Sequence, residues 1–503
     1  MKLLKILFSK PILIVFSIFL QIAFFMSFFY MVQLSFQWVQ AITYVLTIVV
    51  FLAIVNKDSK PDHKLPWLTL ILLVPFFGLI MFLLFGNVRI SKKHRKIFKE
   101  LQAQEQFLKD EREEERIRVK LGEHYGQSLS IKKQGGYNAY TNTSTKYFST
   151  GEDFYQSLLE DLKQAKKFIF MEYFIIERGF MWDGILEILK EKVSSGVDVR
   201  ILYDDFGCLW KLKNNYYKTL RKLGIKCYKF NKFNPTVSNV HNYRDHRKIT
   251  VIDGRVAYTG GANIADEYIN VVQKFGYWKD TAIRISGEAV KNFTLMFLQN
   301  YYLMANIKTE RYEKFVSESF AEPEDGVVQP FASDTIRRVG ESVLLNIINQ
   351  AKNYVYITTP YLICDFTLLS AIKEAAVRGV DVRIVVPNIP DKKIVWMQTR
   401  SNFYGLIKEG VKIYQYDPGF IHSKVILCDD LVGIVGTINL DYRSLVHHFE
   451  DGVYMYNTSC LKDVAKDFED NFRVSTLQTL ETAKLGFFNR LFCAFIKIFS
   501  PMM

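Results

Sequence analysis

One pattern of chemically active residues occurs twice in this chain with identical spacing. In both copies a lysine follows a histidine by two positions, and an aspartate follows the lysine by five. A glycine then follows the aspartate by seven positions, and an asparagine follows the glycine by three. A repeat this regular predicts a duplicated domain, and two halves that face each other would bring both copies to one site. The copies are His246, Lys248, Asp253, Gly260 and Asn263, then His422, Lys424, Asp429, Gly436 and Asn439.

Three further pairs of segments extend the repeat beyond this motif. They lie 186, 183 and 186 residues apart, against 176 residues between the two histidines, a drift that connecting loops can absorb. The period is that of a whole domain and not of a short solenoid repeat. The matched segments are 164–170 with 350–356, 196–201 with 379–384, and 224–228 with 410–414.

The segments around these matches alternate between strand and helix patterns. Residues 168–174 and 354–359 are rich in aromatic and β-branched residues, and each is followed by a helix-period segment and a β-branched strand. We therefore predict an α/β fold with two similar halves, each a mixed, largely parallel sheet flanked by helices, sharing one active site. Each histidine would lie at the entry to a short strand, Lys248–Ile252 or Lys424–Cys428.

Histidine, lysine and asparagine together suit the cleavage of a phosphodiester. One imidazole can attack phosphorus while the other donates a proton to the leaving alkoxide, and the residues alone do not distinguish which does which. Lys248 and Lys424 would neutralise the phosphate oxygens, and Asn263 and Asn439 would bind them through their amides. This chemistry needs no cofactor and no metal. The six scattered cysteines contain no C-x-x-C pair and predict no metal cage.

A nucleophilic histidine also needs an acceptor for its second ring nitrogen. The candidates that orient the histidines are Asp280, 34 residues after His246, and Glu450, 28 residues after His422. Because these carboxylates lie outside the repeated motif, they rest on weaker evidence than the motif residues.

Other polar residues near the motif admit more than one interpretation. We predict Asp253 and Asp429 as catalytic because they belong to the motif, although the turns that they open suit a structural role at least as well. Ser423 would suggest a serine nucleophile. Arg247 occupies the same position in the other copy, which argues against that mechanism.

The first 88 residues have the composition of membrane segments. No charged residue occurs from Pro11 to Asn56, and a further uncharged run extends from Pro66 to Val88. A helix needs about 20 residues to cross the hydrocarbon core of a bilayer. The first run is too long for a signal peptide core and lacks a small-x-small exit, which disfavours cleavage. The predicted membrane segments are about 11–33, 38–55 and 66–88.

Basic clusters flank all three apolar runs, and positive charge favours the cytoplasmic side. The three clusters cannot all be cytoplasmic if the third run crosses the membrane fully. Either this run is re-entrant or bent near Pro75 and Gly78, or one cluster lies on the other side of the membrane despite its charge. The densest cluster adjoins the soluble part. We therefore predict a multi-pass protein of the cell membrane whose catalytic part faces the cytoplasm. The clusters are Lys2, Lys5 and Lys10; Lys57, Lys60 and Lys64; and Arg89, Lys92, Lys93, Arg95 and Lys96.

These patterns divide the chain into five regions. The second is charged on all faces and predicts a solvated connecting helix. The last has apolar residues at helical spacing, including Phe488, Leu491 and Phe495, and fits either an interfacial helix or a helix packed on its own domain. The regions are membrane segments 1–88, the charged linker helix 89–122, the first half 123–320, the second half 321–484 and the amphipathic C-terminal segment 485–503.

The paired motif H-x-K-x4-D-x6-G-x2-N resembles that of the phospholipase D superfamily, and longer stretches resemble bacterial cardiolipin synthases. The resemblance covers about residues 38–503. It is carried by NYRDHRKITVIDG from Asn242, GGANIADEY from Gly260, HSKVILCDD from His422 and PWLTLILLVPFFGLIMFLLFG from Pro66.

The resemblance implies a phosphatidyl transfer between two phosphatidylglycerol molecules through a phosphohistidine, with release of glycerol. It also implies that His246 is the nucleophile and His422 the general acid and base. The expected partners are phosphatidylglycerol, other anionic phospholipids and the membrane, in keeping with the net charge of +13. An oligomer is compatible with the sequence.

Three alternatives remain open from the sequence. A phospholipid hydrolase would use the same chemistry with water in place of the second lipid. A nuclease suits the positive charge, but much of that charge flanks apolar segments, so no nucleic acid partner is expected. A non-catalytic membrane scaffold is disfavoured because the histidine, lysine and asparagine are intact in both copies.

Overall fold

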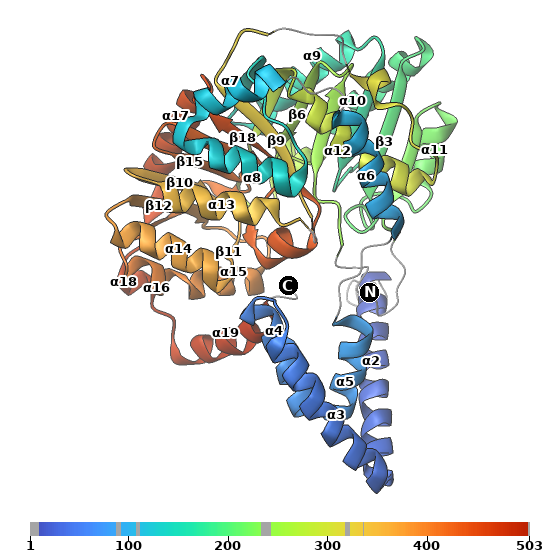
Figure 1. Ribbon diagram of the computed structural model, residues 1–503, viewed down its shortest axis with the longest axis vertical. Coiled ribbons are helices and arrows are strands. Elements are labelled where there is room, and N and C mark those ends of the chain that lie inside the picture. Colours follow the sequence, from blue (N-terminus) through green and yellow to red (C-terminus); the bar gives the residue numbers. More distant parts are fainter. Residues whose placement is uncertain are drawn as a thin grey trace. The chain divides into compact units, whose positions relative to one another are not determined.

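The computed structural model describes residues 10–86, 92–106, 111–232, 243–316, 322–334 and 337–500 (Figure 1). These residues belong to two compact units. The smaller unit contains the described residues 10–86 and 494–500, and the larger contains the described residues between 92 and 493. The larger unit contains both copies of the repeated motif.

The first half of the larger unit is built on a seven-stranded sheet. Its strands and helices are β1 (Thr143–Phe148), α9 (Gly151–Gln164), β2 (Phe168–Tyr173), α10 (Phe180–Ser194), β3 (Asp198–Asp204), α11 (Tyr216–Lys222), β4 (Lys226–Phe230), β5 (Lys248–Ile252), β6 (Val256–Gly260), β7 (Tyr277–Lys279), β8 (Ala282–Gly287) and α12 (Val290–Ala305). The strand order is β1-β8-β6-β5-β2-β3-β4, and β7 pairs elsewhere.

The second half repeats this arrangement on an eight-stranded sheet. Its strand order is β19-β13-β12-β10-β15-β16-β18-β9. Its elements are β9 (Val327–Ser333), α13 (Val339–Gln350), β10 (Tyr354–Thr358), β11 (Leu362–Ile363), α14 (Phe366–Val377), β12 (Asp381–Pro387), α15 (Lys393–Ser401), α16 (Phe403–Ile407), β13 (Lys412–Tyr416), β14 (Gly419–Ile421), β15 (Val425–Cys428), β16 (Val432–Gly436), β17 (Leu440–Asp441), η5 (Arg443–His447), β18 (Glu450–Tyr456), α17 (Leu461–Arg473), β19 (Ser475–Leu477) and α18 (Leu480–Ala483). The last helix, α19 (Phe487–Phe499), begins in the larger unit, and its residues from Ala494 onward belong to the smaller one.

The predicted α/β class and the two similar halves are confirmed, but the sheets are not largely parallel. In the first sheet β2, β3 and β4 are parallel because helices connect them, whereas β5, β6, β8 and β1 all pair in the antiparallel sense. The second sheet has the same division. The chain turns back tightly after each histidine strand. Asp253 and Asp429 have positive φ angles of 54° and 53° at these turns.

The two halves share a core and exchange backbone hydrogen bonds. One cluster of buried side chains includes Phe297 on α12 and Phe331 on β9, so it extends across both halves. Strand β7 of the first half pairs in parallel with β14 of the second, and Asp245 forms a bridge with Phe449. These two contacts between halves determine where the histidines lie.

The connecting region differs from the solvated helix predicted for 89–122. Its described parts form α6 (Lys92–Gln106) and α7 (Glu111–Leu121). Ile97 and Leu101 on α6, and Ile117 and Leu121 on α7, are buried. Each pair is four residues apart, so each helix buries a narrow apolar stripe that the surrounding charges obscure in the sequence.

The smaller unit begins with two long apolar helices. They are α2 (Lys10–Ser35) and α3 (Gln37–Asn56), and Phe36 between them has an extended backbone. Among the helices whose side chains are described, α3 is the one that is long and apolar enough to cross a membrane, with 17% of its apolar window buried; a shorter apolar stretch is Phe19–Val32.

The third apolar run is a helical hairpin. It forms α4 (Pro61–Leu73) and α5 (Pro75–Phe85), which are separated at Val74 because Pro75 has no N–H to continue α4. The rings of Trp67 and Phe82 lie 5.6 Å apart. A side chain at Gly78 would meet the backbone of Ile71 at 2.7 Å, so the close approach of the two helices requires glycine there.

Candidate active site

Each histidine is positioned by a backbone hydrogen bond to the opposite half. The amide of His246 donates to the carbonyl of Phe449 (2.9 Å), and the amide of His422 donates to the carbonyl of Lys279 (2.8 Å). Phe449 and Lys279 directly precede the candidate carboxylates Glu450 and Asp280 in the sequence. Backbone pairing therefore brings each histidine next to the carboxylate of the other half.

The two carboxylates bind the histidines crosswise. Nδ1 of His246 lies 2.9 Å from Oε2 of Glu450, and Nδ1 of His422 lies 2.7 Å from Oδ2 of Asp280. Both carboxylates are fully buried, and both histidines are 7% exposed. A carboxylate on Nδ1 holds the ring in the tautomer that leaves Nε2 for chemistry, and it stabilises the imidazolium when one forms. The sequence selected both carboxylates but did not reveal that they are exchanged between halves.

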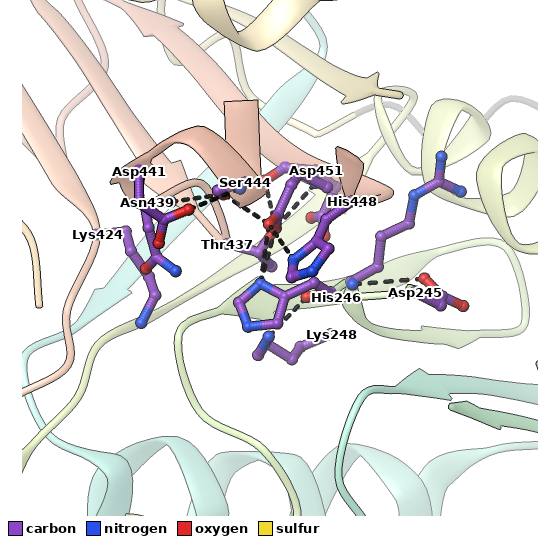
Figure 2. Close-up of polar contacts among 12 residues, drawn as sticks. Asp245, His246, Lys248, Lys424, Thr437, Asn439, Asp441, Ser444, His448 and Asp451 are labelled. Atoms are coloured by element: carbon purple, nitrogen blue, oxygen red, sulfur yellow. Dashed lines mark hydrogen bonds and ion pairs between the residues drawn. The ribbon is translucent and has the colours of Figure 1, made fainter. Parts of the chain in front are cut away.

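Residues that the sequence analysis missed hold these carboxylates in place. Glu450 accepts hydrogen bonds from Ser444 Oγ (2.6 Å) and Thr437 Oγ1 (2.5 Å). Figure 2 shows Ser444 and Thr437 near His246. Asp280 accepts from the amide of Thr281 (2.9 Å) and from Nε1 of Trp278 (3.3 Å). Thr437 directly follows the motif glycine, which is the sequence signal that could have drawn attention to it.

The two motif lysines are buried beside the histidines. Lys248 donates to the carbonyl of His246 (2.6 Å), and Lys424 donates to the carbonyl of His422. Burial lowers the pKa of Lys248 to about 8 and that of Lys424 to about 7, and repulsion from Lys248 adds to the effect on Lys424.

The histidines have depressed pKa values for the same reasons. Burial, followed by the charges of Lys248, Lys424 and His422, lowers the pKa of His246 well below its usual value. Burial and then Lys424 lower the pKa of His422 to about 4, against the raising effect of Asp280. The repulsion among these four groups indicates one electrostatic site, and an anion bound among them would raise all four pKa values.

The motif asparagines differ in how firmly they are held. The Asn263 side chain accepts from the amide of Ile175 (3.0 Å) and donates to Tyr268 Oη (2.7 Å). Oδ1 of Asn439 is buried without a hydrogen-bond partner among the described residues. Figure 2 shows Asn439 beside Lys424, on the side of the site formed by the second half.

The motif aspartates lie away from the reacting groups. Asp253 accepts hydrogen bonds from the amides of Lys166, Lys167 and Phe168 at the start of β2. Asp429 accepts from the amides of three residues at the start of β10 in the same way. Each aspartate is at the end of its strand opposite to the histidine, about 16 Å along it at the usual rise per residue. The prediction that they are catalytic is therefore corrected, and their role is structural.

The residue between the motif histidine and lysine does not take part in the site chemistry. Ser423 Oγ lies 2.6 Å from Thr358 Oγ1, and both are buried. Arg247 occupies the same position in the first half, where its guanidinium is buried beside Glu172. This pairing supports the argument against a serine nucleophile.

One group of ligand atoms among the described residues has metal-like spacing. It consists of His246, His448 and Glu450, whose ligand atoms lie within 4.8 Å of one another. The oxygens of Glu450 already accept hydrogen bonds from His246, Ser444 and Thr437. This arrangement is that of a carboxylate that orients an imidazole.

Two similar α/β halves that share a pair of carboxylate-bound histidines and a pair of lysines define a phospholipase D-like protein. The family described as "Cardiolipin synthase, PLD-like domain" matches residues 158–292 and 344–473. A second family, described as "Phospholipase_D-nuclease N-terminal", matches residues 45–87. The chain belongs to the cardiolipin synthase family.

The chain is similar to other proteins over most of its length. A cardiolipin synthase of Alkalihalophilus pseudofirmus is 36% identical over 90% of this chain and 92% of its own length. An uncharacterized protein of Streptococcus mutans is 42% identical over 90% of this chain and 99% of its own. The crystal structure of a phosphatidylserine synthase from Haemophilus influenzae has the same fold, with a TM-score of 0.57 and 15% identity over 75% of this chain and 98% of that one.

Proposed function

We propose that this chain is a membrane-bound cardiolipin synthase. It transfers a phosphatidyl group from one phosphatidylglycerol to another and releases glycerol. The observation that carries the proposal is the crossed pair of histidine–carboxylate contacts, His246 with Glu450 and His422 with Asp280. A buried site with two imidazoles and two lysines suits a phosphodiester, and membership of the family supports a phospholipid substrate.

In the first step His246 attacks the phosphorus of phosphatidylglycerol through Nε2. The bond from phosphorus to the glycerol oxygen breaks, and His422 gives that oxygen a proton, so that glycerol leaves neutral. The charge of the bound phosphodiester raises the pKa of His422 from its low value, which allows the ring to carry this proton. Glu450 stabilises the positive charge that develops on His246.

In the second step the hydroxyl of another phosphatidylglycerol attacks the phosphohistidine. His422 removes the proton from that hydroxyl, a new phosphorus–oxygen bond forms, and the bond to Nε2 of His246 breaks. Lys248, Lys424 and the amide groups of Asn263 and Asn439 stabilise the phosphate oxygens in both steps. The products are cardiolipin and the free enzyme.

The experiment that tests this function identifies the lipid product. The purified full-length chain is incubated with vesicles that contain phosphatidylglycerol labelled in its glycerol headgroup and in its acyl chains. We expect labelled cardiolipin and one free glycerol for each cardiolipin formed. Phosphatidic acid without cardiolipin would identify a hydrolase, and no turnover would favour a scaffold. The His246→Ala variant is the control for contaminating activity.

We further propose that the chain crosses the membrane with the larger unit in the cytoplasm. Helix α3 follows α2 directly after Phe36, and α4 and α5 form a hairpin, so the basic residues at Lys10 and Lys57–Lys64 share one side with the end of α5. At about 1.5 Å per residue, α4 and α5 are shorter than the hydrocarbon core. A re-entrant hairpin removes the conflict among the positive clusters.

Cysteine labelling tests this orientation. All six native cysteines are buried, so a cysteine at Lys60 provides a distinct target. In intact cells a membrane-impermeant maleimide should not react with Lys60→Cys, and it should react after the cells are opened. Labelling of intact cells would contradict the cytoplasmic orientation.

Helix α19 supports attachment of the larger unit to a bilayer surface. Phe487, Phe488 and Leu491 are 74%, 82% and 61% exposed. Cys493 on the same helix is buried, and its carbonyl accepts a hydrogen bond from Gln398 Nε2 (2.8 Å). The helix thus holds α15 with one face and presents apolar side chains on another, which is the arrangement of an interfacial helix. Replacing Phe488 with serine should lower activity on vesicles more than on detergent-dispersed lipid.

A further inference from the structure

A third imidazole, His448, lies beside the proposed nucleophile. Its ring centroid is 5.3 Å from that of His246, and its Nδ1 is 3.6 Å from Oε1 of Glu450. His448 is buried, and Figure 2 shows its ring beside that of His246. Neither proposed step of phosphatidyl transfer uses this residue.

The first half has an indole in the equivalent position. Trp278 precedes Asp280 by two residues, as His448 precedes Glu450 by two. The Trp278 ring lies 5.3 Å from the ring of His422, the same separation as between His448 and His246. Its Nε1 donates to Asp280 at 3.3 Å. The duplicated fold thus places a nitrogen-bearing ring against each histidine and next to its carboxylate.

A third aromatic ring completes the cluster in each half. Phe174 lies 5.1 Å from His246 and 6.5 Å from His448. Tyr268 lies 5.6 Å from His422 and 4.9 Å from Trp278. At 3.6 Å from Oε1 of Glu450, the buried Nδ1 of His448 has no hydrogen-bond partner among the described residues, and a shift of about half an ångström would bring it within hydrogen-bond distance of that oxygen.

We infer that His448 is a positioning residue for His246. As a neutral imidazole with its proton on Nδ1, it donates to Glu450, as Trp278 donates to Asp280. This donation reduces the negative charge that Glu450 offers to His246, and so keeps His246 neutral and nucleophilic. The inference rests on the proposed function, because it assigns His448 a role through the nucleophile of that reaction.

The electrostatic surroundings agree with a neutral His448. Burial lowers the pKa of His448 to about 3, and the neighbouring His246 and Arg443 act in the same direction, against the effect of Glu450. The other charged groups that face His246 are Lys248 on β5, Lys424 and His422 at the entry to β15, and Lys392 before α15. His246 and His448 therefore lie among positive charges, where an additional proton on His448 is unfavourable.

The test compares His448→Phe with His448→Asn by the pH profile of kcat/KM for phosphatidylglycerol. Phenylalanine keeps the ring but removes the donor, so Glu450 becomes a stronger base and raises the pKa of His246. The acid limb, which reports deprotonation of the nucleophile, should then move up by about half to one pH unit. The amide of asparagine restores a donor and should restore the wild-type limb.

Several outcomes separate this role from simple packing. An unchanged acid limb in His448→Phe overturns the inference, as does an equal loss of kcat in both variants without a shift. If the phenylalanine variant does not fold, His448→Leu replaces it, because leucine matches asparagine in shape but has no donor. His124→Phe, in the 3-10 turn Gly122–His124, is the control for loss of an imidazole elsewhere.

The wild-type measurement distinguishes this inference from the proposed function. If the wild-type chain forms no cardiolipin, the proposed function fails first. If it forms cardiolipin and His448→Phe has the wild-type pH profile, only the role of His448 fails.

Discussion

The two copies of the repeated motif have the same backbone but are held in different ways. In the first copy the residue after the histidine is Arg247, buried with its guanidinium 3.9 Å from Glu172. In the second copy it is Ser423, whose hydroxyl meets that of Thr358. One copy is supported by buried charges and the other by a neutral hydroxyl pair.

The two copies thus keep the same site geometry, but different interactions stabilise them. Burial raises the pKa of Asp245 well above its usual value and raises that of Glu172, and Arg247 opposes both effects. Glu172 also accepts from Asn300 (2.7 Å). A charged group in such a network cannot be removed without leaving its partners unpaired. The first copy should therefore be more sensitive to substitution than the second.

The largest expected effect comes from the histidines, where the two copies should be equivalent. His246→Ala and His422→Ala should each reduce cardiolipin formation by about 10⁵-fold or more, since neither ring can replace the other. The measurement is product formation from labelled phosphatidylglycerol, with circular dichroism to verify folding. Turnover near the wild-type rate in either variant would remove the two-histidine mechanism.

Substitution of the carboxylates should produce the next largest effect on activity. It should also distinguish the role of the first copy from that of the second. Glu450→Gln and Asp280→Asn keep the shape but remove the charge, and each should lower kcat by about 10³ to 10⁴-fold. Glu450→Gln should slow formation of the phosphohistidine, because Glu450 binds His246. Alkaline quenching preserves this intermediate and allows its formation to be timed. A slowed first step with Asp280→Asn and a normal one with Glu450→Gln would reverse the assignment of the nucleophile.

Lys424→Met should lower activity by about a hundredfold and at the same time stabilise the fold. The pKa of Lys424 is lowered to about 7, so the unfolded chain binds more protons than the folded one between this value and the usual pKa of lysine. The wild-type protein thus gains stability as the pH rises through this window. The variant should melt a few degrees higher at pH 7, and the difference should shrink towards pH 10. Equal melting temperatures at pH 7 would contradict a buried, destabilised ammonium.

The smallest effects on activity should come from the residues between histidine and lysine, where the stabilities of the copies diverge. Arg247→Met should destabilise the larger unit by about 3–5 kcal/mol because buried carboxyls lose their cation. Ser423→Ala should cost only about 1 kcal/mol, the usual cost of a lost hydroxyl pair. Chemical unfolding of the two variants gives both values. Similar costs would mean that the copies are supported alike.

The sequence predicted which residues form the site better than it predicted which histidine contacts which carboxylate. Spacing selected the histidines and lysines, and chemistry selected Asp280 and Glu450 as acceptors. The crossed pairing depends on the β7–β14 pairing and on the bridge from Asp245 to Phe449, which are long-range contacts that no local pattern reports. Asp253 and Asp429 were assigned to catalysis because repetition alone does not separate a residue kept for chemistry from one kept for folding.

The sequence predicted the α/β class and the two similar halves correctly, but the predicted direction of most strand pairs was wrong. The crossover helices α10 and α14 were visible, and they do yield parallel pairs. The later strands have similar β-branched patterns whether they run parallel or antiparallel, so the excess of antiparallel pairing was not visible. His448 and Trp278 were missed because an imidazole and an indole in matched positions do not look like a repeat.

The exchange of carboxylates has a consequence for the synthesis of the chain. His246 leaves the ribosome 204 residues ahead of Glu450, so a nascent or truncated first half holds its histidine without the acceptor that orients it. Such a fragment, even if it folds and is attached to the membrane, should be unable to form a covalent adduct with a lipid headgroup. Under the proposed mechanism, His246 would therefore become reactive only after Glu450 has been synthesised.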